Sequence, residues 1–296
     1  MPELPEVETV KTGLAPYFEN ATFSEVEVRR PNLRFPFPEN FRENILGKQV
    51  TNMGRRSKYL LVDLSSGDVL VMHLGMSGSF RIIELDSSGK PVNDADEHSK
   101  LPQHDHVVFH LTPVKAGQGT PAKVIYNDPR RFGFMTLIPR EALETHALFA
   151  KMGIEPLGNQ LSGPFLQSLF SGKKSNLKSS LLNQQLIAGL GNIYVCEALW
   201  RSKLDPQRAS STVADNAEQA EVLVANIRAV LQDAIAAGGS TLKDHVQADG
   251  SLGYFQHSFA VYGREGEACR TEGCTGQVAR IVQSGRSTFY CPECQH

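Results

Sequence analysis

The residues best suited to chemistry stand at the start of the chain. A small second residue favours removal of the initiator methionine, and Pro2 would then carry a free secondary amine. Such an amine can attack a sugar aldehyde carbon and form an iminium, which draws electrons from neighbouring bonds. Glu3 is adjacent, and Glu6 follows one helical turn later on the same face. This pattern predicts an accessible nucleophile beside a proton donor, although proline and acidic residues are also ordinary at a helix N-terminus.

A second chemical signal is the group of four cysteines near the end of the chain. Cys269 and Cys274 have four residues between them, Cys291 and Cys294 have two, and sixteen residues separate the pairs. Two close thiolate pairs suit tetrahedral zinc, and a closed set of four is structural because no ligand position stays open. A ribbon this short cannot bury a core, so we expect one Zn²⁺ to supply its folding energy. Disulfides or incidental thiols are the alternative.

Basic and polar residues at predicted turns are candidates for contact with phosphate. Arg286 lies at the turn of the cysteine ribbon, where a long cation can reach outward. Asn192 begins a predicted helix after a glycine-containing loop, where backbone N–H groups and the helix dipole favour an anion. Residues 156–196 contain no acid, and they include Lys174. Helix capping and solvated surface charge are the ordinary explanations of such residues.

Composition permits a DNA-binding protein without requiring one. The 296 residues carry a formal net charge of −2, but their basic residues are locally concentrated, and local fields decide what a groove attracts. No apolar run is long enough to span a membrane, and the N-terminus lacks the pattern of a signal peptide. We therefore expect a cytoplasmic protein without a membrane partner.

Hydrophobic periodicity divides the chain into three parts. Residues 1–138 contain short strand-like runs with turns between them, which predicts an antiparallel β-sandwich with flanking helices. Residues 139–260 carry helical periodicity, for example over 141–151 and 215–237. Residues 261–296 hold the cysteine ribbon. The predicted class is therefore α+β, with a sandwich domain, a helical domain and a small metal module.

Several distant blocks carry a resemblance to a known family. The main ones are Pro2-Glu3-Leu4-Pro5-Glu6-Val7-Glu8-Thr9, Gly189-Leu190-Gly191-Asn192-Ile193-Tyr194 and the four-cysteine ribbon. Together they resemble the formamidopyrimidine-DNA glycosylases. Further blocks agree and stand in the same order: Arg55–Leu60, His73–Gly78, Asp128–Gly133 and Gly253–Phe255. The resemblance runs from Pro2 to Cys294, and it departs from the family in the wider Cys269–Cys274 spacing and a longer polar insertion before His104.

The resemblance implies a two-lobed enzyme with a β-sandwich lobe and a helix-two-turn-helix lobe that carries a zinc ribbon. Pro2 would be the Schiff-base nucleophile at C1′ of the damaged nucleotide, and Glu3 would protonate the sugar ring oxygen with support from Glu6. Lys58 would assist β-elimination and contact phosphate, and Arg286 would grip phosphate and assist δ-elimination. On residue type alone, Lys58 is a solvated strand end.

The resemblance also implies how DNA is held. A target inside the base stack is unreachable, so the nucleotide must turn out, and side chains must fill the gap. Met76, Arg130 and Phe132 match the gap-filling residues. Met76 and Phe132 would more often be core residues, were it not for Gly75, Gly78 and Gly133, which flank them and expose those turns. The segment 241–254 resembles a loop that closes over an extruded oxidised purine. The implied DNA-binding set is His104, Arg130, Lys174, Asn192, Met76 and Phe132.

The resemblance implies a bifunctional DNA glycosylase and AP lyase of base excision repair. It would excise oxidised purines such as 8-oxoguanine and formamidopyrimidines from double-stranded damaged DNA, and then cut the strand by β,δ-elimination. It would act as a monomer in the bacterial cytoplasm, associated with the nucleoid, with structural zinc and no other cofactor. A sister glycosylase for oxidised pyrimidines is one alternative, which Leu4 and the 241–254 segment disfavour. An inactive DNA-binding protein is another, which Pro2, Glu3 and Lys58 disfavour.

Overall fold

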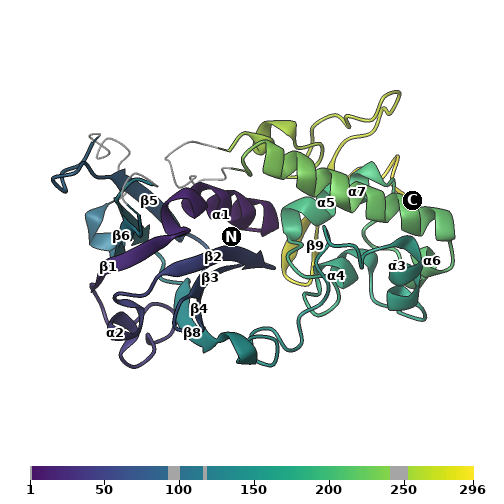
Figure 1. Cartoon of the computed structure of the whole chain (residues 1–296). Helices are drawn as coiled ribbons and strands as arrows, with labels where there is room; N and C mark the ends of the chain where they lie inside the picture. Colours follow the sequence, from purple (N-terminus) through teal and green to yellow (C-terminus); the bar gives the residue numbers. More distant parts are fainter. Residues whose placement is uncertain (1, 93–100, 116–118, 241–252) are drawn as a thin grey trace. The chain divides into compact units, whose positions relative to one another are not determined.

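The computed structural model describes residues 2–92, 101–115, 119–240 and 253–296, which form two compact units (Figure 1). The first unit extends to Ala150 and also takes in the described residues of 238–253. The second unit comprises Lys151–Ala237 and Tyr254–His296. The three-part division at residues 138/139 and 260/261 stays a prediction.

The first unit is built on two antiparallel four-stranded sheets. One sheet has the order β1-β6-β7-β5, with β1 at Ala21–Val28, β6 at Asp105–Pro113, β7 at Ala122–Asn127 and β5 at Ser79–Glu84. The other has the order β2-β3-β4-β8, with β2 at Val50–Arg56, β3 at Tyr59–Leu64, β4 at Asp68–His73 and β8 at Phe134–Pro139. Buried side chains from both sheets share one hydrophobic core. The predicted antiparallel sandwich and the α+β class are confirmed.

Helix α1, at Leu4–Phe18, buries one face in this core. Val7, Val10 and Leu14 recur at helical spacing and are fully buried. At the end of the helix, Phe18 meets the rings of Phe23 and Phe109 edge to face at 5.9 and 6.1 Å. The core thus fixes the position of the N-terminal residues that precede α1. The short helices among the described residues of this unit are α2 at Phe41–Ile45, η2 at Pro102–His104 and η3 at Arg140–Ala142.

The second unit is helical and ends in a two-stranded ribbon. Its helices are α3 at Gly163–Phe170, α4 at Leu177–Leu182, α5 at Asn192–Arg201, α6 at Ser211–Ala214, α7 at Ala217–Ala236 and η4 at Phe255–Ser258. Helix α7 confirms the periodicity over 215–237, and it buries Leu223, Ile227 and Leu231. No helix in the described ranges has the length and apolar character needed to cross a bilayer.

The helix predicted over 141–151 is wrong. The structure has η3 followed by successive turns there. The hydroxyl of Thr145 donates to the carbonyl of Ala142 at 3.1 Å, and such a local bond competes with helix formation. Leu143 and Phe149 are nevertheless buried, so the hydrophobic spacing reflects burial and not a continuous helix.

The cysteine ribbon consists of β9, at Ala279–Gln283, and β10, at Arg286–Tyr290. The two strands pair in antiparallel fashion, with Arg286 opposite Gln283. Ser284 and Gly285 form the two-residue turn, with φ angles of 50° and 74°. Two positive φ angles suit the tight hairpin turns that match strand twist. The turn predicted at these residues is confirmed.

Candidate functional site

The N-terminal residues are held by a reciprocal hydrogen-bond pattern at the start of α1. Glu3 is the N-cap, and the Glu6 carboxylate accepts the backbone N–H of Glu3 at 2.8 Å. Both glutamates are buried. Pro2 is also buried in the chain that still carries Met1, where its nitrogen is an amide. The predicted nucleophile therefore requires removal of Met1, which turns this amide nitrogen into a free secondary amine.

Glu6 also holds the chain at residue 240. Its Oε1 accepts both the backbone N–H and the hydroxyl of Ser240, each at 2.9 Å. A Cβ at Gly239 would lie 3.3 Å from the Glu6 side chain, and one at Gly253 would lie 2.3 Å from the Gly239 carbonyl. Residues 240 and 253 thus lie near the start of α1. The loop predicted at 241–254 falls mostly outside the described residues.

Lys58 lies in the two-residue turn between β2 and β3, where Arg56 pairs with Tyr59. Lys58 is only 7% exposed, so the alternative that residue type alone suggested, a solvated strand end, does not hold. Arg55 donates to the Ser57 carbonyl and to Glu8 Oε2, both at 2.7 Å, and so ties this turn to α1. Burial raises the pKa of Glu8, but hydrogen bonds from Lys11 and Arg55 outweigh it and hold that pKa below its ordinary value.

His73 lies beside the turn of Lys58, and nothing in the sequence singled it out as a candidate residue. It pairs with Tyr59 across β3 and β4, and its ring stacks on Phe134 at 5.5 Å. Burial, with the nearby charges of Lys58 and Arg34, lowers the pKa of His73 to about 4. Its Nδ1 accepts the Gly75 N–H at 3.1 Å, so the neutral ring carries its proton on Nε2. One signal could have identified His73: it pairs across the two strands with Tyr59, the residue after Lys58.

Met76 and Phe132 are exposed at adjoining turns of the first unit, as the glycines beside them predict. Their exposed fractions are 37% and 42%. The Arg130 guanidinium lies over the Phe132 ring, 5.0 Å from its centroid. A Cβ at Gly75 would lie 2.3 Å from Gly133 N, which shows how closely the two turns approach. The predicted gap-filling residues therefore share one surface.

His104 ends η2 beside the same surface. Its backbone carbonyl accepts the Asp128 N–H at 3.0 Å, and Asp128 stands two residues before Arg130. The first unit therefore brings His104 close to the turn that carries Arg130 and Phe132.

In the second unit, Asn192 and Arg286 lie close together although they are far apart in sequence. Asn192 starts α5 and donates from Nδ2 to the Ser287 carbonyl at 2.8 Å. Lys178, 1% exposed, donates to the same carbonyl at 3.0 Å and to Thr288 Oγ1 at 2.6 Å. These bonds hold the ribbon against α4 and α5 next to the exposed Arg286. Lys174 is exposed and stands three residues before the start of α4.

The four predicted cysteines converge within the second unit. Their sulfur atoms all lie within 4.8 Å of one another, with Cys269–Cys294 and Cys274–Cys291 each at 3.7 Å. A tetrahedral zinc with Zn–S bonds of about 2.3 Å would place sulfurs about 3.8 Å apart. Backbone N–H groups point at Cys269 and Cys274, at 3.4 Å each. This donor set can hold a metal ion, and the wider first spacing does not disturb it.

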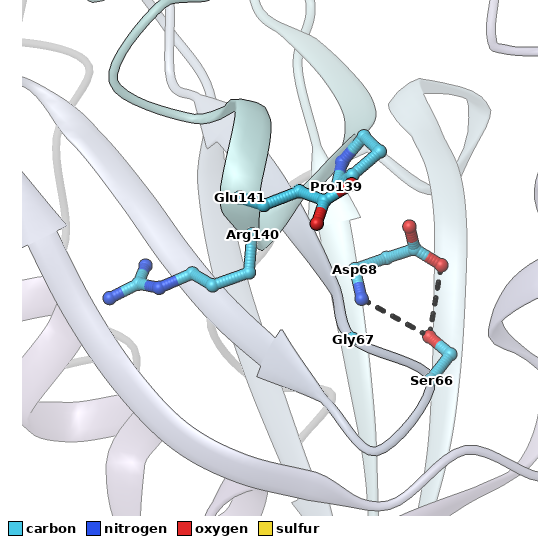
Figure 2. Close-up of a pocket in the computed structure, with 6 residues that line it drawn as sticks. All are labelled: Ser66, Gly67, Asp68, Pro139, Arg140 and Glu141. Atoms are coloured by element: carbon cyan, nitrogen blue, oxygen red, sulfur yellow. Dashed lines mark hydrogen bonds between the residues drawn. The ribbon is translucent and has the colours of Figure 1, made fainter.

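Two open cavities on the first unit differ in their lining. One, of about 530 Å³, lies at the β3–β4 turn and the end of β8, and contains none of the predicted site residues (Figure 2). Its lining residues are Ser66, Gly67, Asp68, Pro139, Arg140 and Glu141. The other, of about 460 Å³, borders the Arg130–Phe132 turn. Its lining residues are Asn32, Leu33, Arg34, Arg130, Arg131 and Phe132. The second cavity is therefore strongly basic.

Comparison with known proteins agrees with this geometry. Residues 1–135 match the formamidopyrimidine-DNA glycosylase N-terminal domain, and residues 152–246 match the H2TH domain of the same glycosylases. The formamidopyrimidine-DNA glycosylase of Sinorhizobium medicae is 60% identical over 310 residues, and that of Brucella ovis is 58% identical over 295; each comparison covers 100% of both chains.

Solved structures show the same relationship. An FPG mutant of Lactococcus lactis in complex with DNA containing Fapy-dG superposes with a TM-score of 0.83, at 30% identity and 100% coverage of both chains. The MutM (FPG) protein of Thermus thermophilus gives a TM-score of 0.80 at 35% identity, covering 99% of this chain and 98% of that one. The chain, with its buried N-terminal glutamates and its cluster of four cysteines, belongs to the formamidopyrimidine-DNA glycosylase family.

Proposed function

We propose that this DNA glycosylase excises oxidised purines from duplex DNA and then cuts the strand at the resulting site by β,δ-elimination. The observation that carries the proposal is the buried arrangement at the N-terminus, where Glu6 fixes the backbone of Glu3 directly beside Pro2. The name shared by the relatives and the Fapy-dG complex of the Lactococcus lactis protein support the same substrate class.

The chemistry begins once Met1 has been removed. The lone pair of the Pro2 nitrogen attacks C1′ of the damaged nucleotide, and Glu3 protonates the sugar ring oxygen. The ring C1′–O bond and the bond to the base break, and the base leaves with a proton. The resulting iminium accepts the electrons released when a proton leaves C2′, so the 3′ phosphate departs. A second elimination releases the 5′ phosphate and leaves a one-nucleotide gap.

Glu3 is suited to proton transfer because it stands next to Pro2 in the chain, at the start of α1. A carboxyl group in that position can pass a proton to an atom bound close to the attacking nitrogen. Glu6 supports this group by fixing the first turn of α1. The capping pattern therefore serves both the helix and the reaction.

Phosphate contacts are assigned in each unit. In the first unit, Lys58 holds a phosphate next to the lesion and assists β-elimination, with the neutral Nε2–H of His73 as a further donor. In the second, Asn192 and Arg286 bind phosphate, Arg286 assists δ-elimination, and Lys174 adds a contact to the backbone. The acid-free surroundings of these residues in the sequence support the assignment.

Extrusion of the nucleotide is assigned to Met76, Arg130 and Phe132, with His104 as a neighbouring DNA contact. The exposure of Met76 and Phe132 supports this role, because apolar side chains at exposed turns can enter a base stack. Cys269, Cys274, Cys291 and Cys294 hold one structural Zn²⁺ that stabilises the ribbon carrying Arg286. The enzyme acts as a monomer on nucleoid DNA in the bacterial cytoplasm.

Borohydride trapping on a duplex with one 8-oxoguanine tests the proposal. We expect a covalent protein–DNA adduct with the wild-type protein, because borohydride reduces the iminium to a stable amine. Pro2→Gly should lower its yield at least about tenfold, because the flexible terminus no longer fixes the attacking nitrogen. Glu3→Gln should trap on a preformed abasic site but not on the lesion. Asp68→Asn, in the cavity of Figure 2, is the matched control.

The same assay separates the alternatives. No adduct from wild-type protein that lacks Met1 would favour an inactive DNA-binding protein. A clearly higher yield on oxidised pyrimidines than on 8-oxoguanine would favour the sister glycosylase.

A further inference from the structure

Asp128 is a fully buried carboxylate that the mechanism above does not use. It follows β7 and precedes the turn that carries Arg130 and Phe132. Its Oδ1 accepts the Ser77 hydroxyl at 2.5 Å. Its Oδ2 accepts the Gly133 N–H at 2.9 Å and the Tyr126 hydroxyl at 3.3 Å. Three donors of the first unit thus converge on one carboxylate.

Two of these donors come from the two gap-filling turns, and the third, Tyr126, comes from β7. Ser77 follows Met76, and Gly133 follows Phe132. The Ser77 hydroxyl oxygen also accepts the Arg130 N–H at 3.2 Å, so the hydrogen bonds close a ring between the two turns. The backbone carbonyl of Asp128 accepts from His106 Nε2 at 2.9 Å, which anchors the carboxylate to β6.

The backbone of the two turns packs so closely around Tyr126 and Asp128 that no further side chain fits between them. A Cβ at Gly133 would lie 1.9 Å from the Tyr126 hydroxyl oxygen, and one at Gly78 would lie 2.4 Å from the same atom. Burial, with the charge of Asp128 next to it, raises the pKa of Tyr126 well above its ordinary value, so this hydroxyl stays a donor. Glycine at both positions therefore lets the two turns pack directly around the Tyr126–Asp128 pair.

We propose that Asp128 is a positioning residue that joins the Met76 turn and the Arg130–Phe132 turn into one rigid wedge for nucleotide extrusion. The inference rests on the proposed function. Extrusion requires the apolar side chains to occupy the gap together. If the two turns moved independently, each would lose conformational entropy on insertion, and that loss would oppose extrusion. The carboxylate removes that cost in advance because it fixes both turns in the free protein.

Asp128→Asn tests the proposal with little change in volume. Asparagine offers one acceptor oxygen where aspartate offers two. Its NH₂ group would therefore face N–H or O–H groups whose hydrogen bonds the Asp128 carboxylate now accepts. We expect single-turnover excision of 8-oxoguanine from duplex DNA to slow about ten- to hundredfold, the range expected for misplaced positioning groups. Strand cleavage at a preformed abasic site should stay within about twofold, because no base has to leave the stack there.

Two further variants separate positioning from general stability. Ser77→Ala removes one of the bonds to Asp128 and the bond from Arg130 N, so it should give a smaller loss with the same substrate selectivity, even if Asp128→Asn folds poorly. In the Met76→Ala/Phe132→Ala background, Asp128→Asn should slow excision by less than about threefold, because no wedge remains to be positioned. Asp68→Asn is the control for loss of a carboxylate in the same unit, because the Asp68 carboxylate accepts from the hydroxyl of nearby Ser66 and lies away from both gap-filling turns.

The outcomes are distinguishable. Equal losses on the lesion and on the abasic site, or full additivity with the Met76 and Phe132 substitutions, would assign Asp128 a structural role only. Unchanged excision by both Asp128→Asn and Ser77→Ala would overturn the inference as well. If the wild-type protein does not excise 8-oxoguanine, the proposed function fails, independently of Asp128.

Discussion

At the scale of single residues, buried charged and polar groups hold the candidate site of the first unit in place. Glu6 accepts three hydrogen bonds that join the backbone of Glu3 to Ser240. The sequence predicted Pro2, Glu3 and Glu6, because their spacing along one helix is local. It did not predict His73 or Asp128, because their partners come from other strands and turns, and side-chain burial depends on strand pairing.

His73 provides a prediction about pH. Its pKa is about 4 in the folded protein and about 6.5 without burial, so between these values the unfolded chain binds more protons than the folded one. Stability should therefore be retained above pH 6.5 and fall as the pH drops toward 4. His73→Gln should reduce the loss in unfolding free energy between pH 7.5 and 4.5 by about 2–3 kcal/mol, measured by denaturant titration.

The exposed residue His257 supplies the matched control. His257→Asn should lose as much unfolding free energy between pH 7.5 and 4.5 as the wild-type protein does. The same acid-side loss in His73→Gln as in the wild-type protein would contradict the assignment of a buried, neutral His73.

At the scale of elements, helix α5 carries a buried carboxylate that anchors a distant segment of the second unit. Glu197 is buried and accepts the backbone N–H groups of Ala260, Val261 and Tyr262 at 2.9 to 3.0 Å. These residues lead into the cysteine module. Periodicity predicted α7, and the Ser284-Gly285 turn predicted the ribbon, because those signals are local. The role of Glu197 could not be predicted, because its partners follow more than sixty residues later.

Glu197→Ala should destabilise the zinc-loaded protein by about 3–5 kcal/mol, because three buried N–H groups lose their acceptor. Glu197→Gln keeps one acceptor oxygen and should cost less. Denaturant unfolding monitored by circular dichroism measures both. Glu218→Gln, at an exposed position in the first turn of α7, should stay within about 0.5 kcal/mol of the wild-type protein. A cost of less than about 1 kcal/mol for Glu197→Ala would exclude the anchoring role.

At the scale of the whole molecule, function was predicted from blocks that are far apart in sequence but stand in the family order. The net charge of −2 gave little indication of a DNA-binding protein. What indicated it was the local absence of acids, as around Lys174, because phosphate responds to nearby charge. The proposal that the turns of Met76 and Phe132 form one wedge needed the three-dimensional structure, because it depends on backbone approach at Gly75 and Gly133.

Salt dependence tests the assignment of Lys174 as a phosphate contact. Lys174→Ala should reduce the slope of log affinity against log salt concentration by about one unit, because one fewer counterion is released on binding. Fluorescence anisotropy with an uncleavable lesion duplex measures this slope. Lys151→Ala, at another exposed lysine of the same unit, should leave it unchanged. Equal slopes for Lys174→Ala and the wild-type protein would remove Lys174 from the phosphate contacts.

The identity of the trapped nucleophile tests the account most directly. After borohydride reduction on an 8-oxoguanine duplex, proteolysis and tandem mass spectrometry locate the deoxyribose remnant. We predict that it is attached to the nitrogen of Pro2, in an N-terminal peptide that lacks Met1. A remnant on a lysine such as Lys58, or an adduct whose protein keeps Met1, would contradict the account.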